Sequence, residues 1–348
     1  MKSNGRPRST RISLQAMAFR VWLSFGVLAP FAFVGTVRAE ERAEPKLLLT
    51  WGQRGDKPGE FHSPISIAIT SNDEVFVTDL NNARIQQFTN DGEYRGGFDL
   101  PLDAPPRKSC LIGGMAIDDT GLIYLGFMNQ HRIAVYTPAG EVIREWGKRG
   151  TGDGEFHMPG GIVLLPDKTL LAVDQCNHRV QKFTTDGKYL GQWGGYGSEP
   201  GRFGAPEAAG SRFGGPHFLA KDSKDRLYTT EGVAGRIQQL SLDGRPLRAW
   251  GNKSSEPGGF GEYQFGNMKN SFGPVGVLVD RSDRIWVSSL NDLVQAFSPE
   301  GKFLFGIDGT GDEPGKLSKP HGMAVDNRGH LYVADAGNQR IQKFELPP

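Results

Sequence analysis

The chain has 348 residues, of which 48 are glycine and 22 are proline, and its formal net charge at pH 7 is +1. Apolar residues are interleaved along its length, which excludes a disordered chain, and glycine lacks the three-residue period of a collagen. The length allows either one large all-β domain or two average domains. Frequent turns between short strands account best for the glycine.

The first 39 residues form a separate segment with the layout of a secretory signal peptide. They carry six basic residues and no acid, and an apolar stretch of 14 residues runs from Val21 to Val34 before Val37-Arg38-Ala39. A membrane-spanning helix needs roughly 20 residues, so we expect no stable span after cleavage. An uncleaved anchor is the alternative. We therefore expect an exported protein, periplasmic or extracellular, with a mature domain over residues 40–348.

Removal of this leader changes the charge of the chain. The remainder holds 34 basic and 39 acidic residues, a net charge of about −5. Proteins that bind nucleic acid gain affinity from clustered Lys and Arg. This balance therefore argues against a nucleic-acid partner.

A repeat fills the rest of the sequence. Three segments align without a gap, FHSPISIAITSNDEVFVTDLNNARIQQF at 61–88, FHMPGGIVLLPDKTLLAVDQCNHRVQKF at 156–183 and LSKPHGMAVDNRGHLYVADAGNQRIQKF at 317–344. Six units are counted, with inner strands that begin near Ile65, Gly113, Gly160, His217, Val275 and His321. Apolar residues within a unit alternate with a period of two between turn signals, which predicts four short antiparallel strands. Such units predict an all-β, six-bladed β-propeller.

The sixth unit ends without its outer strand. The segment from Lys46 to Gly52, which ends in the Trp-Gly that closes other units, is a spare strand. Pairing the two removes free strand edges that would otherwise template aggregation. We therefore predict that the N-terminal strand closes the ring in the last blade.

The turn after the second strand resembles the NHL repeat. Asp174-Gln-Cys-Asn177-His178-Arg179 carries the motif, and the segments 79–84 and 335–340 match it equally well. The resemblance covers roughly residues 46–346 and implies the propeller architecture, which by itself assigns no function. The motif Asp and Arg recur from blade to blade, so we interpret them as structural residues.

Six of the seven histidines fall in loops of one face, which we call the top face. It carries the loops that lead into the inner strands and the loops that join second to third strands. His217 and His321 each follow a proline at the first position of an inner strand, so we expect both to face the central channel.

The chain also resembles peptidyl-hydroxyglycine amidating lyases, which implies zinc held by histidines of alternate blades around the channel. His217 and His321 match that pattern, whereas Gly113 stands where a third ligand would come, and Cys110 is a poorly placed substitute. Catalytic zinc normally has three protein ligands. Two interpretations follow: the pair hydrogen-bonds at the channel mouth, or it holds a metal, zinc or calcium.

The two cysteines lie in top-face loops of adjacent blades. Cys110 precedes the inner strand of blade 2, and Cys176 belongs to the motif of blade 3. An exported protein meets an oxidising compartment, which permits a disulfide between them. A Cα separation beyond about 7 Å would forbid it.

Two long insertions also belong to the top face. The first precedes the inner strand of blade 4 and ends near Phe213, and the second, before blade 5, contains Tyr263, Phe265 and Phe272. Long loops in a compact fold are often functional, and aromatic rims suit peptide, glycan or small-ligand binding. Mutual packing of the aromatic rings is the alternative.

Two functions follow from these features. The first is an exported propeller that binds a protein, peptide or glycan through its top face. The second is a metal-dependent lyase or hydrolase centred on His217 and His321.

Overall fold

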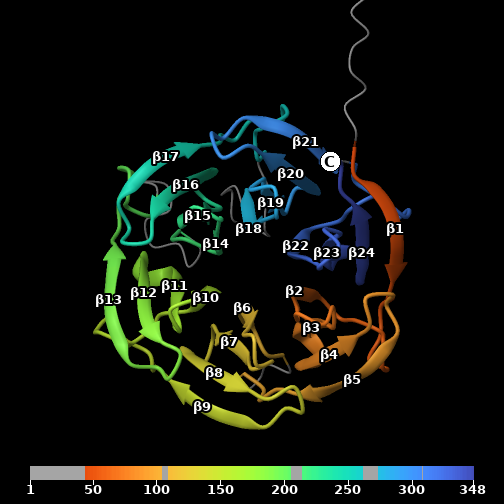
Figure 1. Cartoon of the computed structure of the whole chain (residues 1–348), viewed down its shortest axis with the longest axis horizontal. Helices are drawn as coiled ribbons and strands as arrows, with labels where there is room; N and C mark the ends of the chain where they lie inside the picture. Colours follow the sequence, from red (N-terminus) through yellow and green to blue (C-terminus); the bar gives the residue numbers. More distant parts are fainter. Residues whose placement is uncertain (1–43, 104–108, 205–213, 262–272, 308) are drawn as a thin grey trace, which may run out of the picture. The chain divides into compact units, whose positions relative to one another are not determined.

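A computed structural model of the chain describes residues 44–103, 109–204, 214–261, 273–307 and 309–348. These residues form six four-stranded antiparallel sheets arranged as the blades of a ring (Figure 1). The predicted six-bladed, all-β propeller is therefore confirmed. Helical structure in the described residues is limited to short 3-10 turns, η1 (Leu80–Asn82), η2 (Gln175–Asn177) and η4 (Ala336–Asn338).

Each blade runs from an inner strand beside the channel to an outer strand at the rim of the ring. Blade 1 contains β2 (Pro64–Ile69), β3 (Val75–Asp79), β4 (Arg84–Phe88) and β5 (Tyr94–Asp99). Blade 2 contains β6 (Ile112–Ile117), β7 (Ile123–Phe127), β8 (Arg132–Tyr136) and β9 (Val142–Trp146). Blade 3 contains β10 (Pro159–Leu164), β11 (Thr169–Asp174), β12 (Arg179–Thr184) and β13 (Tyr189–Gly194).

The other three blades follow the same order. Blade 4 contains β14 (Leu219–Lys221), β15 (Arg226–Glu231), β16 (Arg236–Ser241) and β17 (Pro246–Trp250). Blade 5 contains β18 (Pro274–Val279), β19 (Ile285–Ser289), β20 (Leu293–Phe297) and β21 (Phe303–Ile307). Blade 6 contains β22 (Pro320–Val325), β23 (Leu331–Asp335) and β24 (Arg340–Glu345), and its fourth strand is β1 (Lys46–Trp51).

The N-terminal strand closes the ring as predicted. β1 pairs antiparallel with β24, from Lys46 opposite Glu345 to Trp51 opposite Ile341. The ring of Trp51 then packs against Phe88 of the next blade, with centroids 6.0 Å apart. Both ends of the propeller are thus held in one blade, and β24 has a partner on its outer side.

Outer-strand tryptophans lie over glycines in the turn between the third and fourth strands of the next blade. Trp193 lies over Gly244, whose φ is +82°, and a Cβ at this glycine would come within 2.1 Å of the indole. The same pairing recurs between Trp51 and Gly92, Trp146 and Gly187, and Trp250 and Gly301. Because a side chain there would be strained and would displace the indole, glycine is required.

The motif Asp and Arg are structural, as interpreted from the repeat. Asp174 is fully buried, and its Oδ2 accepts a hydrogen bond of 2.7 Å from Nε of Arg179. The same pair forms between Asp79 and Arg84, and between Asp335 and Arg340. In each pair the guanidinium also donates to backbone carbonyls of the loop before the inner strand, which fixes the loop to the blade.

Inner strands of neighbouring blades approach each other closely in the upper part of the channel. A Cβ at Gly160 would lie 2.5 Å from the carbonyl oxygen of His217 in the next blade. A Cβ at Gly113 would lie 2.4 Å from the carbonyl oxygen of Pro159. Glycine at these positions therefore allows six blades to close around a narrow channel.

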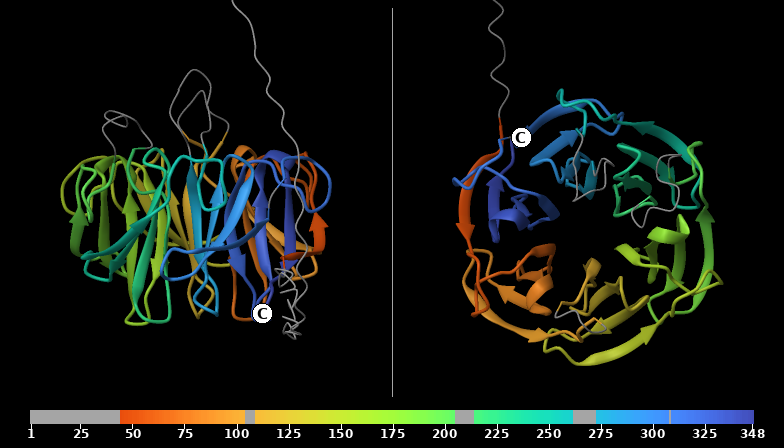
Figure 2. Two further views of the ribbon diagram at one scale, coloured as in Figure 1. Left: turned by 90° about the horizontal axis from the view of Figure 1, so that it is seen from above. Right: turned by 180° about the vertical axis from the view of Figure 1, so that it is seen from behind.

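Loops collect on the two faces of the ring because the strands run between these faces (Figure 2). The loops before the inner strands and the second-to-third strand loops share one face, since Leu80 N–H donates to Ser63 O and Cys176 N–H donates to His157 O. The predicted top face is therefore a single surface of the propeller.

Candidate functional site

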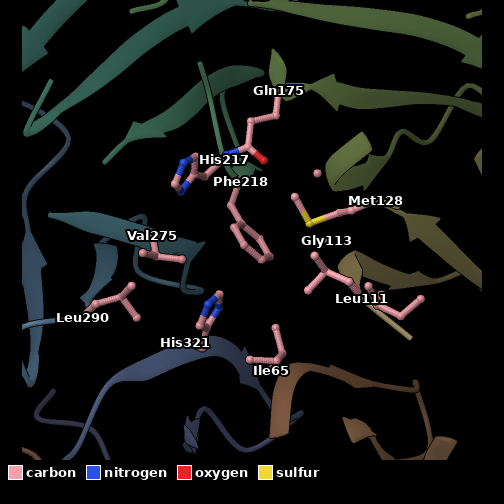
Figure 3. A pocket seen from close by; sticks show the side chains of 12 residues that line it. Ile65, Leu111, Gly113, Met128, Gln175, His217, Phe218, Val275, Leu290 and His321 are labelled. Atoms are coloured by element: carbon pink, nitrogen blue, oxygen red, sulfur yellow. The ribbon is translucent and has the colours of Figure 1, made fainter. Parts of the chain in front are cut away.

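The channel opens on the top face into a cavity of about 320 Å³. It is lined by Ile65, Leu111, Ile112, Gly113, Met128, Gly160, Gln175, His217, Phe218, Val275, Leu290 and His321. Residues of all six blades contribute, and none of these residues is Asp, Glu, Lys or Arg. The walls are therefore mainly apolar, with the polar side chains of Gln175, His217 and His321 set among them (Figure 3).

His217 and His321 both face this cavity, as the sequence predicted (Figure 3). His321 is the second residue of β22, whereas β14 begins only at Leu219, so the expectation that His217 starts an inner strand is wrong. His217 N–H still donates to Thr230 O at 2.9 Å. This bond pairs the segment just before β14 with β15, and it fixes the imidazole at the channel mouth.

The imidazole of His321 is held in its neutral form. Its Nδ1 is buried, and the ring makes no hydrogen bond to any described residue. Burial, and next the nearby imidazole of His217, lower the pKa of His321 to about 4. The ring packs edge-on against Phe218, with centroids 6.1 Å apart. At neutral pH the cavity therefore contains a neutral heteroaromatic ring with unused hydrogen-bonding capacity.

Gln175 is the third polar residue of the cavity, and it was not among the candidate residues predicted from the sequence. It is only 2% exposed, and its amide points toward the cavity (Figure 3). No described residue hydrogen-bonds its side chain, whereas its backbone N–H donates to Met158 O. It is the first residue of η2, directly after the motif Asp174.

A register signal in the repeat would have identified Gln175. The position after the second strand is occupied by Leu80, Met128, Gln175, Gly232, Leu290 and Ala336 in the six blades. Three of these residues, Met128, Gln175 and Leu290, line the cavity. This register therefore places a residue on the cavity in blades 2, 3 and 5, and the only polar one among the six is Gln175.

Phe218 forms the floor of the cavity. It also lines a second cavity of about 220 Å³, which lies farther down the channel beside the inner strands. That lower cavity is bordered mainly by inner-strand residues such as Gly114, Gly276 and Gly322. Phe218 thus separates the two cavities and sets the depth of the upper one.

The described residues contain no group of three or more His, Cys, Asp or Glu side chains arranged to hold a metal ion. Gly113 lies in the cavity wall where the third histidine would be needed. Cys110 does not replace it, because its buried side chain packs in an apolar cluster with Phe127 and Tyr136. Burial, and next the charge of Asp103, raise the pKa of the Cys110 thiol to about 12. This keeps it from acting as a thiolate ligand.

The disulfide that the sequence permits between Cys110 and Cys176 is not formed. Cys110 is turned into the core of blade 2, whereas Cys176 is half-buried in the 3-10 turn η2 of blade 3. The two share a face of the ring, but the packing of Cys110 directs its sulfur away from that surface.

The predicted aromatic rim lies outside the described residues. It comprised Phe213, Tyr263, Phe265 and Phe272. These four remain sequence-based candidates for ligand contact.

The other histidines lie where the repeat predicts. His131 and His157 are neighbours on the top face, with ring centroids 5.6 Å apart. His178, in the next loop, packs edge-on against Tyr196. His330 lies in the turn between β22 and β23 on the opposite face, where its Nδ1 is 2.9 Å from Oδ2 of Asp326.

Comparison with protein families matches the NHL repeat at residues 61–88, 156–183 and 317–344. These are the three segments that align in the sequence and that fold into the first three strands of blades 1, 3 and 6. The chain is a six-bladed propeller that contains three NHL repeats. Blades 2, 4 and 5 keep the four strands without a match to the repeat.

Two curated relatives align over different lengths. Human E3 ubiquitin-protein ligase TRIM32 is 26% identical over 305 residues, which is 84% of this chain and 37% of the relative. Mouse peptidyl-glycine alpha-amidating monooxygenase is 33% identical over 142 residues, which is 37% of this chain and 14% of the relative. The aligned regions are thus less than half of these proteins.

Solved structures share the fold at low sequence identity. A streptogramin B lyase superposes with a TM-score of 0.55 at 15% identity, over 87% of this chain and 97% of the other. A gluconolactonase from Xanthomonas campestris gives 0.56 at 16% identity, over 88% and 95%. Both likenesses support the architecture.

No helix in the described part of the chain is long and apolar enough to cross a membrane.

Proposed function

We propose that this NHL-repeat propeller is an exported binding module that recognises a protein or peptide through its top face. The cavity at the channel mouth receives an apolar side chain of the partner. The observation that carries the proposal is the lining of this cavity, which is apolar except for Gln175, His217 and His321.

The physical chemistry of the cavity favours a peptide over a glycan. A sugar presents hydroxyl groups on most of its edges, and each buried hydroxyl without a partner costs free energy. Three polar side chains satisfy few of them. An apolar side chain gains about 25 cal/mol for each Å² removed from water and leaves no polar group unpaired. A partner of this kind also agrees with the similarity to a ubiquitin-protein ligase, whose class acts on proteins.

Peptide selection tests the proposed site. A displayed library of random peptides is selected on the purified propeller, and the selected peptides are titrated against Ile65→Glu, which puts a charge into the half-buried wall of the cavity. We expect a shared apolar anchor residue and at least roughly tenfold weaker binding to the variant, because a carboxylate in this wall loses hydration without a counter-ion.

The matched control is Leu190→Glu, which adds the same charge on the outer strand β13, where the leucine is 46% exposed. Affinity should be unchanged in this control. Selected peptides that bind Ile65→Glu as tightly as the wild type would contradict the proposed site.

Export is tested separately. Intact mass spectrometry of the protein recovered from the periplasm or medium is expected to show a chain that starts at residue 40. A full-length chain retained with the membrane fraction would support the uncleaved anchor instead, and a cytoplasmic chain would contradict export.

A metal-dependent lyase or hydrolase is the second candidate function. It is favoured by one observation, the presence of two histidines from different blades on one cavity. Two protein ligands fall short of the three that catalytic zinc normally has. Elemental analysis decides: one zinc per chain, lost in His217→Ala and in His321→Ala, would support the enzyme, whereas a protein without bound metal would rule out this form of it.

A further inference from the structure

We propose that the cavity at the channel mouth selects a neutral aromatic group that carries one hydrogen-bonding polar atom, such as the phenol of tyrosine or the indole of tryptophan. Gln175 and His321 are the hydrogen-bonding partners, and Phe218 is the aromatic floor. This inference rests on the proposed binding function and specifies the chemistry of its anchor.

The size of the cavity limits the occupant to about one side chain. Its volume of about 320 Å³ is near the lower end of the roughly 300–1,000 Å³ typical of small-molecule sites. Phe218 closes it from below, so a longer group cannot continue into the lower cavity while this ring keeps its place. The site therefore suits a compact ring system.

The described lining residues disfavour ionised occupants. None of the described lining residues is Lys, Arg, Asp or Glu. An ionised group moved into such a site loses its hydration and finds no counter-ion, which costs several kcal/mol. The occupant is therefore neutral.

Two groups in the wall favour an aromatic occupant over an aliphatic one. The side chain of Met128 extends toward the centre of the cavity from the side opposite His321 (Figure 3). Thioether sulfur and aromatic edges contact aromatic rings favourably, by about 0.3–1.5 kcal/mol for each contact. Phe218 and His321 already pack edge-on at 6.1 Å and present further ring surface to an incoming ring.

Two polar groups without a described hydrogen-bond partner require a polar atom on the occupant. The Gln175 residue is 2% exposed, its amide points into the cavity, and no described residue hydrogen-bonds it. In the His321 ring, Nδ1 is buried and has no hydrogen-bond partner. Buried polar groups in proteins are nearly always hydrogen-bonded. A purely apolar occupant would displace water from both groups and leave them unsatisfied, whereas a phenol or indole restores one bond.

Three small probes of similar shape test the inference by calorimetric or NMR titration. They are p-cresol, toluene, which lacks the hydroxyl, and trans-4-methylcyclohexanol, which lacks the aromatic ring. We expect p-cresol to bind about two- to tenfold more tightly than either analogue. This is the change in affinity that one net hydrogen bond, or the loss of the ring contacts, would produce.

Substitutions at Gln175 and His321 test whether these two residues are the hydrogen-bonding partners. In the combined variant Gln175→Leu/His321→Leu, the preference for p-cresol over toluene should fall to about one while toluene still binds. Leu190→Ala on the outer strand is the control and should leave the preference intact. If the combined variant does not fold, as judged by circular dichroism, the two single variants are used, and at least one must reduce the preference.

The outcomes separate this inference from the proposed function. Equal binding of p-cresol and toluene to the wild type, or an unchanged preference in the variants, would overturn it. Selected peptides that are sensitive to Ile65→Glu but carry leucine or valine anchors would also overturn it and would leave the peptide-binding proposal standing. Insensitivity of all selected peptides to Ile65→Glu would instead remove the proposed function.

Discussion

The buried ion pair of blade 3 allows a quantitative test of how the repeat motif holds the propeller together. In Arg179→Met, the guanidinium is lost while an unbranched side chain of similar length remains. Nε of Arg179 donates to Asp174 at 2.7 Å, and its Nη atoms donate to the carbonyls of Thr151, Gly152 and Glu155 at 2.8–2.9 Å. Nη1 also donates to Oε1 of Gln192, so the substitution removes the cation and five hydrogen bonds together.

The expected cost follows from what is left behind. Asp174 is 0% exposed, so its carboxylate would stay buried without its counter-ion. Removal of one partner of a buried pair typically destabilises a protein by about 3–5 kcal/mol. We expect a loss in this range in the free energy of unfolding measured by urea titration and followed by circular dichroism.

Blade 2 offers the matched control. Arg132 occupies the same position of the repeat, but Phe127 replaces the motif acid, and the guanidinium pairs with Glu145, whose side chain is 52% exposed. A half-exposed pair contributes at most about 1 kcal/mol, and the contact of the guanidinium with the Phe127 ring contributes about as much again. Arg132→Met should therefore cost about 2 kcal/mol or less. Equal losses in the two variants, or a loss below about 1 kcal/mol in Arg179→Met, would refute the assignment of the motif as a buried tie.

Three further predictions concern the channel and the closure of the ring. The folded state keeps His321 neutral down to about pH 4, whereas the unfolded chain takes up a proton near pH 6.5. The free energy of unfolding should therefore fall as the pH drops from about 6.5 to 4. The urea midpoint should fall less over this range in His321→Gln than in the wild type, and identical pH profiles would contradict the burial of this ring. Gly160→Ala should lower the free energy of unfolding by about 1–3 kcal/mol, because its Cβ would meet a carbonyl oxygen at 2.5 Å. The control is Gly96→Ala on the outer strand, where a Cβ meets nothing within 4 Å. Its change in stability, measured by thermal melts, should stay within about 0.5 kcal/mol. Trp51→Ala should cost about 3–5 kcal/mol, because it removes the contact between the closing strand and Phe88; an unchanged melting temperature would show that β1 does not hold the ring closed.

The sequence determined the architecture of this protein because its repeat is local. Alternation with a period of two, turn residues at fixed spacing and the recurring Asp and Arg specify each blade from about 45 neighbouring residues. The spare strand from Lys46 to Trp51 specified the closure in the same way, since only one blade lacked an outer strand. The recurrence of His217 and His321 after proline also located both at the channel.

Only the tertiary structure decided the character of the channel mouth. The cavity joins residues as distant in sequence as Ile65 and His321, and their separation depends on how closely glycine lets the six inner strands approach. Whether a side chain points into the shared space or into its own blade also depends on packing. For this reason Cys110 turned into the core of blade 2, Gln175 turned into the cavity, and Phe218 became its floor.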